Sequence, residues 1–152
     1  MRAVVQRVSR STLSIDGEVY SKIDKGFLVL LGVTHSDTEE DAKVLAEKIS
    51  KLRVFRDEND KMNLSVLDID GEVQVVSQFT LYADCHKGNR PSFTNAALPE
   101  RANALYEFFI EEIKKTGIKN VVTGKFGADM KIDFVNSGPV TIILDCVDGK
   151  IL

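Results

Sequence analysis

The sequence predicts an α+β fold: a mixed, mostly antiparallel β-sheet with two helices packed on it. Three observations predict this class. Runs rich in Val, Ile and Leu are bounded by glycine turn signals. Two longer segments carry apolar residues at helical spacing. The order of these runs is several strands, a helix, strands, a helix and strands, which is typical of α+β proteins. The 152 residues suit one domain spanning 1–152.

Residues 3–33 predict a series of strands, two of them joined in a hairpin. Ala3–Val8 alternates loosely and reads as a strand. Thr12–Ile15 and Val19–Ile23 flank Asp16-Gly17, and Asp-Gly between two strand-like runs is a strong hairpin signal. Gly26–Val33 is an unbroken apolar run, which indicates a strand buried on both faces.

Two helices follow from capping signals and apolar periodicity. Ser36 is the expected N-cap of the first helix, with Glu39 completing a capping box. Pro99 opens the second helix, where its missing amide costs nothing, and Gly117 ends it. The buried stripes are Ala42, Leu45, Ile49 and Leu52 in the first helix, and Ala102, Leu105, Tyr106, Phe109 and Ile113 in the second.

The middle of the chain predicts short strands, turns and a loop. Val54-Phe55 predicts a short strand, and 57–61 a polar turn. Calcium binding is the alternative for that turn, but the glycine and distal glutamate of an EF-hand are missing. Asp70-Gly71 signals another turn, and Glu72–Leu81 a strand. Ala83–Phe93 reads as a loop.

Three closing strands are expected, and the composition is that of an ordinary globular protein. The strands are Val121–Phe126, Lys131–Val135 and Val140–Cys146. Hydrophobic content of 43% and charged content of 28% are average, and no apolar run reaches the ~18 residues of a membrane helix. The N-terminal residues lack the pattern of a signal peptide, so a cytoplasmic location is expected. Cys85 and Cys146 have no metal-like spacing and fit a reducing compartment.

Common catalytic motifs are absent. The chain has no P-loop, Rossmann glycine fingerprint, HExxH or GxSxG. We interpret His35 as a structural or surface residue. Asp68 and Asp70 resemble paired carboxylates, but they border a turn, and we interpret them as solvated. Cys85 and His86 invite a dyad reading, but sequence neighbours seldom pair productively and no orienting third group is evident. The hydroxyl candidates that remain are Ser77, Thr80, Ser137 and Thr141.

Two hexapeptides stand out, each with a plain alternative. In Asn136–Thr141, Pro139 lacks an amide donor and Gly138 lacks a Cβ, so carbonyls there are free to face a ligand; a simple turn between strands is the alternative. Ser77–Tyr82 ends a strand-like run, in which Gln78 and Thr80 would share a face. Its alternative is a half-buried edge strand.

Together SQFTLY and NSGPVT resemble the signature pair of the D-aminoacyl-tRNA deacylase family, in the type that carries a Gly-cisPro turn. The segments MRAVVQRV, KGNRPSF and TGKFGADM resemble that family too, so the resemblance covers nearly the whole chain. It implies a barrel-like core of two sheets and a homodimer. It also implies hydrolysis, with no cofactor or metal, of the ester that joins a D-amino acid to the 3′-terminal adenosine of tRNA.

The resemblance also implies roles for individual residues. The catalytic segment is Ser77, Gln78, Phe79 and Thr80, with the amides of Phe79 and Thr80 aimed at the developing oxyanion and the ribose 2′-hydroxyl assisting water. Thr80 as a covalent nucleophile is the competing account. Gly138 and Pro139 would form a rigid wall in the partner subunit's site that excludes L-amino acids. Glycine has no side chain to meet such a wall, so hydrolysis of glycyl-tRNA is expected as a side activity.

The remaining positions are binding candidates. The implied substrate pocket comprises Arg7, Phe126, Met130 and Ser137, with Arg7 bracing the turn through its carbonyls. Candidate contacts to tRNA phosphates are Lys87, Arg90 and Lys125. A net charge of −3 predicts modest, transient RNA binding, and no DNA or membrane partner is expected. The alternatives are a non-catalytic RNA-end or nucleotide-binding module, and a small-molecule hydrolase using Thr80 or Cys85.

Overall fold

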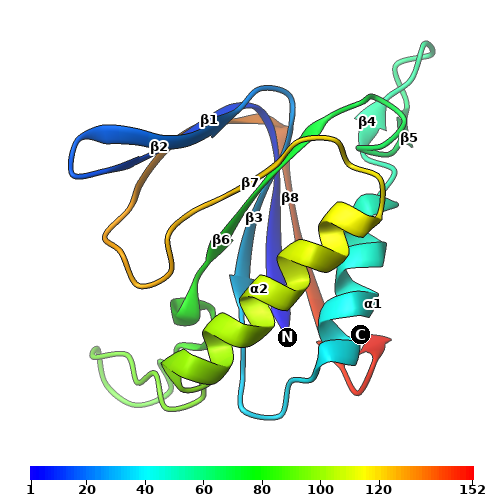
Figure 1. Cartoon of the computed structure of the whole chain (residues 1–152). Helices are drawn as coiled ribbons and strands as arrows, with labels where there is room; N and C mark the ends of the chain where they lie inside the picture. Colours follow the sequence, from blue (N-terminus) through cyan, green and yellow to red (C-terminus); the bar gives the residue numbers. More distant parts are fainter.

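The computed structural model describes residues 1–152 and contains a curled sheet with both helices on one face (Figure 1). The main sheet has the strand order β7-β6-β3-β1-β8-β9, and β2 pairs with β1. A separate small sheet holds β4 and β5. The elements are β1 (Arg2–Ile15), β2 (Glu18–Ile23), β3 (Gly26–Gly32), α1 (Glu39–Ser50), β4 (Phe55–Arg56), β5 (Met62–Leu64), β6 (Glu72–Ser77), the 3-10 helix η1 (Phe79–Tyr82), α2 (Pro99–Lys115), β7 (Val121–Thr123), β8 (Lys131–Val147) and β9 (Lys150–Ile151).

The pairing pattern confirms the α+β class with a mixed sheet. β1 pairs antiparallel with β2, β3 and β8. β6 pairs parallel with β3 and with β7. The predicted turn at Asp70, with φ 53°, is present and leads into the parallel strand β6.

The predicted hairpin at Asp16-Gly17 is confirmed, whereas β1 is longer than expected. Asp16 and Gly17 have φ of 52° and 79°, as a type I′ turn requires. Ala3–Val8 and Thr12–Ile15 are parts of one continuous strand, because β8 pairs with β1 along both parts. The pairing register shifts between Gln6 and Arg10, and bulges of this kind bend a long strand.

Helix α1 begins two residues later than predicted. Thr38, and not Ser36, is the N-cap, and Asp41 replaces Glu39 in the capping box. Asp37 explains the shift, because its carboxylate accepts from the Thr34 amide and pairs with the ammonium of Met1, which fixes the chain ahead of the helix. The expected stripe is buried except for Leu52, which lies beyond the helix and packs against the core.

Helix α2 follows the prediction. Pro99 is its first residue, and Gly117 with φ 101° follows its end. The predicted stripe is buried and joins a core cluster of 26 residues between the helices and the sheet. A second cluster lies within the curl of the sheet and contains Val8, Leu13, Ile23, Leu28 and Val76. No helix is long and apolar enough to cross a bilayer.

Four predicted strands are corrected by the structure. The strand from Glu72 ends at Ser77 rather than Leu81, and η1 follows it. The strand from Val121 ends at Thr123 rather than Phe126. Lys131–Val135 and Val140–Cys146 belong to one strand, β8, in which residues 137–140 loop out of the pairing with β1.

The β4–β5 hairpin surrounds the polar turn at 57–61. β4 is displaced by one residue from the expected Val54-Phe55, and β5 and β9 were not predicted. The Asp57 carboxylate accepts hydrogen bonds from the amides of Asn59 and Lys61 and from Asn63. These donors, the Lys61 amide first among them, lower the pKa of Asp57. The donors of the turn itself thus satisfy the Asp57 carboxylate.

Candidate active site

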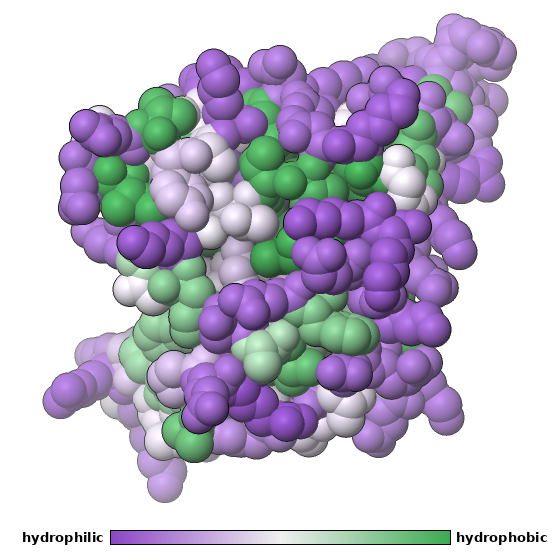
Figure 2. All heavy atoms as spheres, viewed as in Figure 1, coloured by the Kyte–Doolittle hydropathy of each residue, from purple (hydrophilic) through white to green (hydrophobic).

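A cleft of about 630 Å³ opens at the carboxyl end of β6. Its walls are η1, the first turn of α2 and the segment after β7. Figure 2 shows hydrophobic residues gathered between that segment and the start of α2, with polar residues around them. The cleft brings together five of the residues singled out in the sequence, namely Ser77, Gln78, Phe79, Phe126 and Met130.

The 3-10 helix η1 forms one lip of the cleft. Strand β6 ends at Ser77, and the chain turns at once, so Phe79 points into the cleft region instead of away from it. Its ring packs edge-on against Phe93, with centroids 5.1 Å apart. The first amides of a short helix have no carbonyl partner within it, and Gln78 supplies no side-chain cap. The amides of Phe79 and Thr80 are therefore available to a ligand.

Thr80 has no base beside its hydroxyl. The Gln78 side-chain amide donates to Thr80 Oγ1 across 2.6 Å. An amide cannot accept the hydroxyl proton as a general base would. The predicted shared face of Gln78 and Thr80 on a strand is thus replaced by a direct contact in a tight turn. This contact favours a positioning role for Thr80.

Close packing on Gly32 and contacts from Arg2 hold η1 in place. A Cβ on Gly32 would lie 3.0 Å from the Leu81 Cβ and 3.2 Å from the Gln78 carbonyl oxygen, so glycine permits the close approach. Arg2 donates to the Leu81 carbonyl at 3.3 Å and pairs with Asp145 at 2.7 Å. Its guanidinium lies 5.6 Å from the centre of the Tyr82 ring. Arg2 thus ties η1 to β1 and β8, which sequence reasoning did not find.

Phe126 and Met130 form the opposite wall, on the segment after β7. Phe126 lies 6.1 Å from the ring of Tyr106, which is buried and donates to the Val75 carbonyl. Burial raises the pKa of Tyr106 to about 12, so this hydroxyl stays protonated at neutral pH. Gly124 makes room for Met130, since a Cβ there would lie 2.6 Å from the Met130 sulfur. Ordinary core packing therefore sets the shape of this wall.

The second hexapeptide forms a separate feature, which we call the 137–140 loop. The Gly138-Pro139 peptide bond is cis, and Gly138 has φ 128°. Gln6 pairs with Thr141 and Val8 with Asn136, so the four residues between loop out opposite Arg7. The loop is a bulge in a continuous strand, and not the plain turn between two strands.

Arg7 and Asn136 hold the loop. Arg7 is buried, and it donates from Nε to the Ser137 carbonyl at 3.0 Å and from Nη1 to the Val54 carbonyl at 2.5 Å. The Asn136 side chain accepts from the Val140 amide at 3.1 Å and donates to Gln6 at 2.7 Å. Sequence reasoning named Arg7 and Ser137, but it missed Gln6 and Asn136 as supports. The available signal was that Asn136 lies inside the hexapeptide and that Gln6 directly precedes Arg7.

The cleft and the 137–140 loop lie at opposite ends of the sheet. Arg7 pairs with Phe27 at the start of β3, whereas η1 packs on Gly32 at its end. Five residues of strand separate these points, which is roughly 17 Å. Gly138 and Pro139 line another hollow, against β4 and β5, with none of the cleft residues. Within one chain, therefore, the loop does not reach the cleft.

The other candidates fall outside these two features. Lys87, Arg90 and Lys125 are exposed and take part in no ion pair. No hydrogen bond joins the exposed Cys85 to His86, whose amide instead donates to the Asp84 carboxylate. The remaining polar candidates have local partners: His35 contacts the Thr94 carbonyl, Asp68 accepts from the Ser65 amide, and Asp70 pairs with Lys119.

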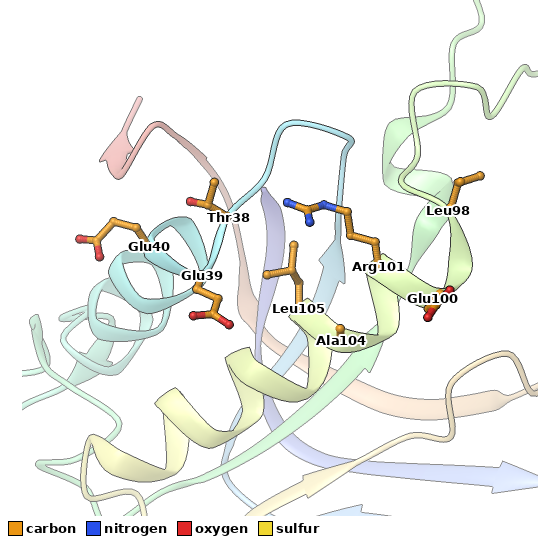
Figure 3. Close-up of a pocket in the computed structure, with 8 residues that line it drawn as sticks. All are labelled: Thr38, Glu39, Glu40, Leu98, Glu100, Arg101, Ala104 and Leu105. Carbon is orange, nitrogen blue, oxygen red and sulfur yellow. The ribbon is translucent and has the colours of Figure 1, made fainter.

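A larger hollow, of about 770 Å³, separates the first turns of α1 and α2 (Figure 3). Glu39, Glu40 and Glu100 line it, and Arg101 donates to the Asp37 carbonyl at 2.5 Å. Three carboxylates around one engaged guanidinium repel a polyanion such as RNA. The cleft, and not this hollow, is therefore the candidate site for an RNA substrate.

Comparison with solved structures identifies the fold. A solved structure described as a probable eukaryotic D-amino acid tRNA deacylase is 16% identical, has a TM-score of 0.81 and covers 93% of this chain and 97% of its own; it shares the fold. A second, titled c-Myc DNA unwinding element binding protein, is 43% identical with a TM-score of 0.91, covering 97% and 99%.

Sequence relatives define the family. A D-aminoacyl-tRNA deacylase of Clostridioides difficile (strain 630) is 58% identical over 145 residues, which is 95% of this chain and 97% of the relative. One of Bacillus cytotoxicus is 54% identical over 95% of this chain and 99% of the relative. The profile of the D-Tyr-tRNA(Tyr) deacylase family matches residues 4–145. The chain belongs to this family.

Proposed function

We propose that the protein hydrolyses the ester bond of D-aminoacyl-tRNA in the cytoplasm, releasing the free D-amino acid and tRNA. The observation that carries the proposal is the position of η1, which presents the amides of Phe79 and Thr80 at the lip of the cleft. Family membership supplies the substrate, and the cleft supplies a surface of suitable shape. An aminoacyl ester is already activated, so electrostatic stabilisation without a side-chain nucleophile suffices.

In the proposed reaction, water attacks the ester carbonyl carbon. The carbonyl oxygen becomes an oxyanion that accepts from the amides of Phe79 and Thr80. The bond to the ribose O3′ then breaks, and O3′ takes a proton while the carboxylate leaves. The substrate's 2′-hydroxyl assists the water, because the structure provides no base at Thr80. The adenosine and amino-acid ends would contact Phe126 and Met130.

Chiral selection is assigned to the 137–140 loop of a second subunit. Roughly 17 Å of strand separates the loop from its own cleft, so the wall must come from another copy if Gly138 and Pro139 act on the substrate. Arg7 and Asn136 hold the loop, which supports its role as a rigid wall. An L side chain would meet backbone atoms that cannot rotate away.

An apolar strip supports a homodimer. Along β8 after the 137–140 loop, the side chains of Ile143 and Val147 are 63% and 45% exposed, on the strand face opposite the buried Leu144 and Cys146. Scattered exposed apolar residues are normal, but two on one face of one strand are suited to a partner surface. The same strand carries the 137–140 loop, so such contact would bring the loop to the partner.

The direct test is the release of labelled tyrosine from D-Tyr-tRNA and L-Tyr-tRNA, with catalytic amounts of protein and a chelator present. We expect rapid release from the D form only. Release from neither form would refute the hydrolase. Equal release from both would leave an esterase without the role given to Gly138 and Pro139.

One observation favours a second candidate, a non-catalytic nucleic-acid-binding module. The 43% identical structure is titled as a DNA-element binding protein. The same assay separates the two functions, because a binder retards charged tRNA in a gel without releasing tyrosine. A small-molecule esterase, the remaining alternative, would lose all activity in Thr80→Ala and would hydrolyse esters lacking RNA.

A further inference from the structure

A small cavity of about 180 Å³ lies on the inner side of the 137–140 loop, between β1, β4 and the start of β3. We call it the basic cavity. Three of its lining residues are cationic, and no Asp or Glu lines it. Its walls are Arg7, Val8, Ser9, Lys25, Phe55, Arg56 and Ser137.

Arg7 is a buried cation without a carboxylate partner. Its side chain is 6% exposed, and its hydrogen bonds go to two carbonyl oxygens. It takes part in none of the ion pairs. Burial lowers its pKa, and the charge of Arg56 lowers it further. Nη2 donates neither of these bonds, and it faces the loop, 2.7 Å from where a Cβ on Gly138 would lie.

The other two cations are available to a ligand. The Lys25 ammonium lies 5.9 Å from the centre of the Phe55 ring and forms no ion pair. Arg56 uses one nitrogen, Nη1, for both oxygens of Asp60, which leaves its other nitrogens without a carboxylate. Asp60 lines the neighbouring hollow and not the basic cavity.

Like charges held together are unfavourable unless an anion offsets them. Two guanidinium groups, one ammonium and the Ser9 hydroxyl around a small cavity match the acceptor oxygens of a phosphate group. At about 30 Å³ for each water, the cavity has room for a phosphate group with its first waters, and not for a nucleoside. We propose that the basic cavity binds a phosphate group.

The source of that phosphate follows from the proposed function, on which this step rests. If the 137–140 loop enters the partner's cleft, the basic cavity lies beside the 3′ end of the tRNA bound there. A backbone phosphate of the acceptor end is then the ligand. This would also reconcile RNA binding with a net charge of −3, because the contact is a built pocket rather than a basic surface.

The test titrates inorganic phosphate into the full chain at constant ionic strength, observed by amide NMR. We expect saturable shifts at Ser9 and Ser137. Lys25→Met, which keeps the aliphatic stem, should weaken binding about tenfold, since a charge-assisted contact is lost. Lys22→Met removes one exposed charge from β2 outside the cavity and should leave the affinity within about twofold.

A substitution that should strengthen phosphate binding provides a second test. Asp60→Asn frees Arg56 from its carboxylate and should tighten phosphate binding several-fold. Asn tolerates the positive φ of 61° at this position, so the backbone should be unaffected. The proposal is overturned if wild type shows no saturable binding, or if Lys25→Met and Lys22→Met weaken it equally. Looser binding in Asp60→Asn would also overturn it.

A second arm identifies the source of the phosphate. With D-Tyr-tRNA, Lys25→Met should raise KM with kcat unchanged and reduce the salt dependence by about one charge. An unchanged KM, beside weakened phosphate binding, would assign the cavity to free phosphate. If wild type deacylates nothing, the proposed function fails, while the phosphate titration still decides the basic cavity.

Discussion

Gly138→Ala is the most informative single substitution, because it adds one carbon at the point where the 137–140 loop meets Arg7. Alanine at φ 128° lies in a backbone region that non-glycine residues avoid, at a cost of about 1–3 kcal/mol. Its Cβ would lie 2.7 Å from Arg7 Nη2 and 2.9 Å from the Val140 Cγ2. Either the loop or the guanidinium must move.

The cost to selectivity follows from the bonds that this movement disturbs. Arg7 makes two charge-assisted hydrogen bonds to carbonyls, each worth about 1.5–3 kcal/mol. Losing one of them, about 2 kcal/mol, would loosen the wall enough to lower the ratio of D to L deacylation about 30-fold. Domains of ordinary stability, about 5–15 kcal/mol, remain folded under such a change.

The assay compares initial rates on D-Tyr-tRNA and L-Tyr-tRNA, together with thermal unfolding. Gly17→Ala is the matched control, because Gly17 also has a positive φ, of 79°, yet nothing lies within 4 Å of a Cβ there. It should lower stability by about 1 kcal/mol and leave the D/L ratio unchanged. A Gly138→Ala protein that unfolds earlier, but keeps the full D/L ratio, would refute the wall.

Four further outcomes are expected. Thr80→Val should keep kcat/KM within about tenfold of wild type, because the hydroxyl accepts from Gln78 and has no base; a complete loss would favour Thr80 as nucleophile. Wild type should hydrolyse glycyl-tRNA in the same release assay, since glycine has no side chain to meet the wall; full resistance would count against it. Arg2→Met should lower kcat more than it raises KM, because the Leu81 carbonyl loses its donor; an unchanged kcat would remove Arg2 as a support of η1. Burial opposes ionisation of Asp41, but hydrogen bonds outweigh it and hold the pKa of Asp41 below the ordinary value. The stabilisation by the ionised carboxylate is therefore present above about pH 4 and is lost as pH falls. The thermal unfolding temperature of Asp41→Asn should depend less on pH in that range than that of wild type.

Elements with local signals were predictable. The Asp16-Gly17 hairpin and helix α2 depend on turn chemistry and on helical periodicity, which neighbouring residues determine. The capping box of α1 was misplaced for a non-local reason. Asp37 is engaged by Met1, 36 residues earlier, and that contact decides which hydroxyl caps the helix.

The candidate site was predictable in its residues but not in its arrangement. Nothing local ends β6 at Ser77; the close packing of η1 on Gly32, more than forty residues earlier, permits the turn. Likewise, Asn136–Thr141 reads as a turn, yet β1 pairs on both sides of it and holds it as a bulge. The basic cavity joins Arg7, Lys25 and Arg56 from three separate parts of the chain, so no sequence motif could predict it.

The pairing of β1 with β8 connects the two halves of the proposed site. At one end Arg7 holds the 137–140 loop, and at the other Arg2 and Asp145 hold η1. Because the bulge lies inside one strand, its position relative to η1 is set by strand register and not by a flexible linker. A second copy that received the loop would thus receive it at a fixed distance from the first copy's own η1. Under the proposed function, rigid spacing of this kind would let backbone atoms alone discriminate between the two hands of an amino acid, which a mobile side chain would do less well.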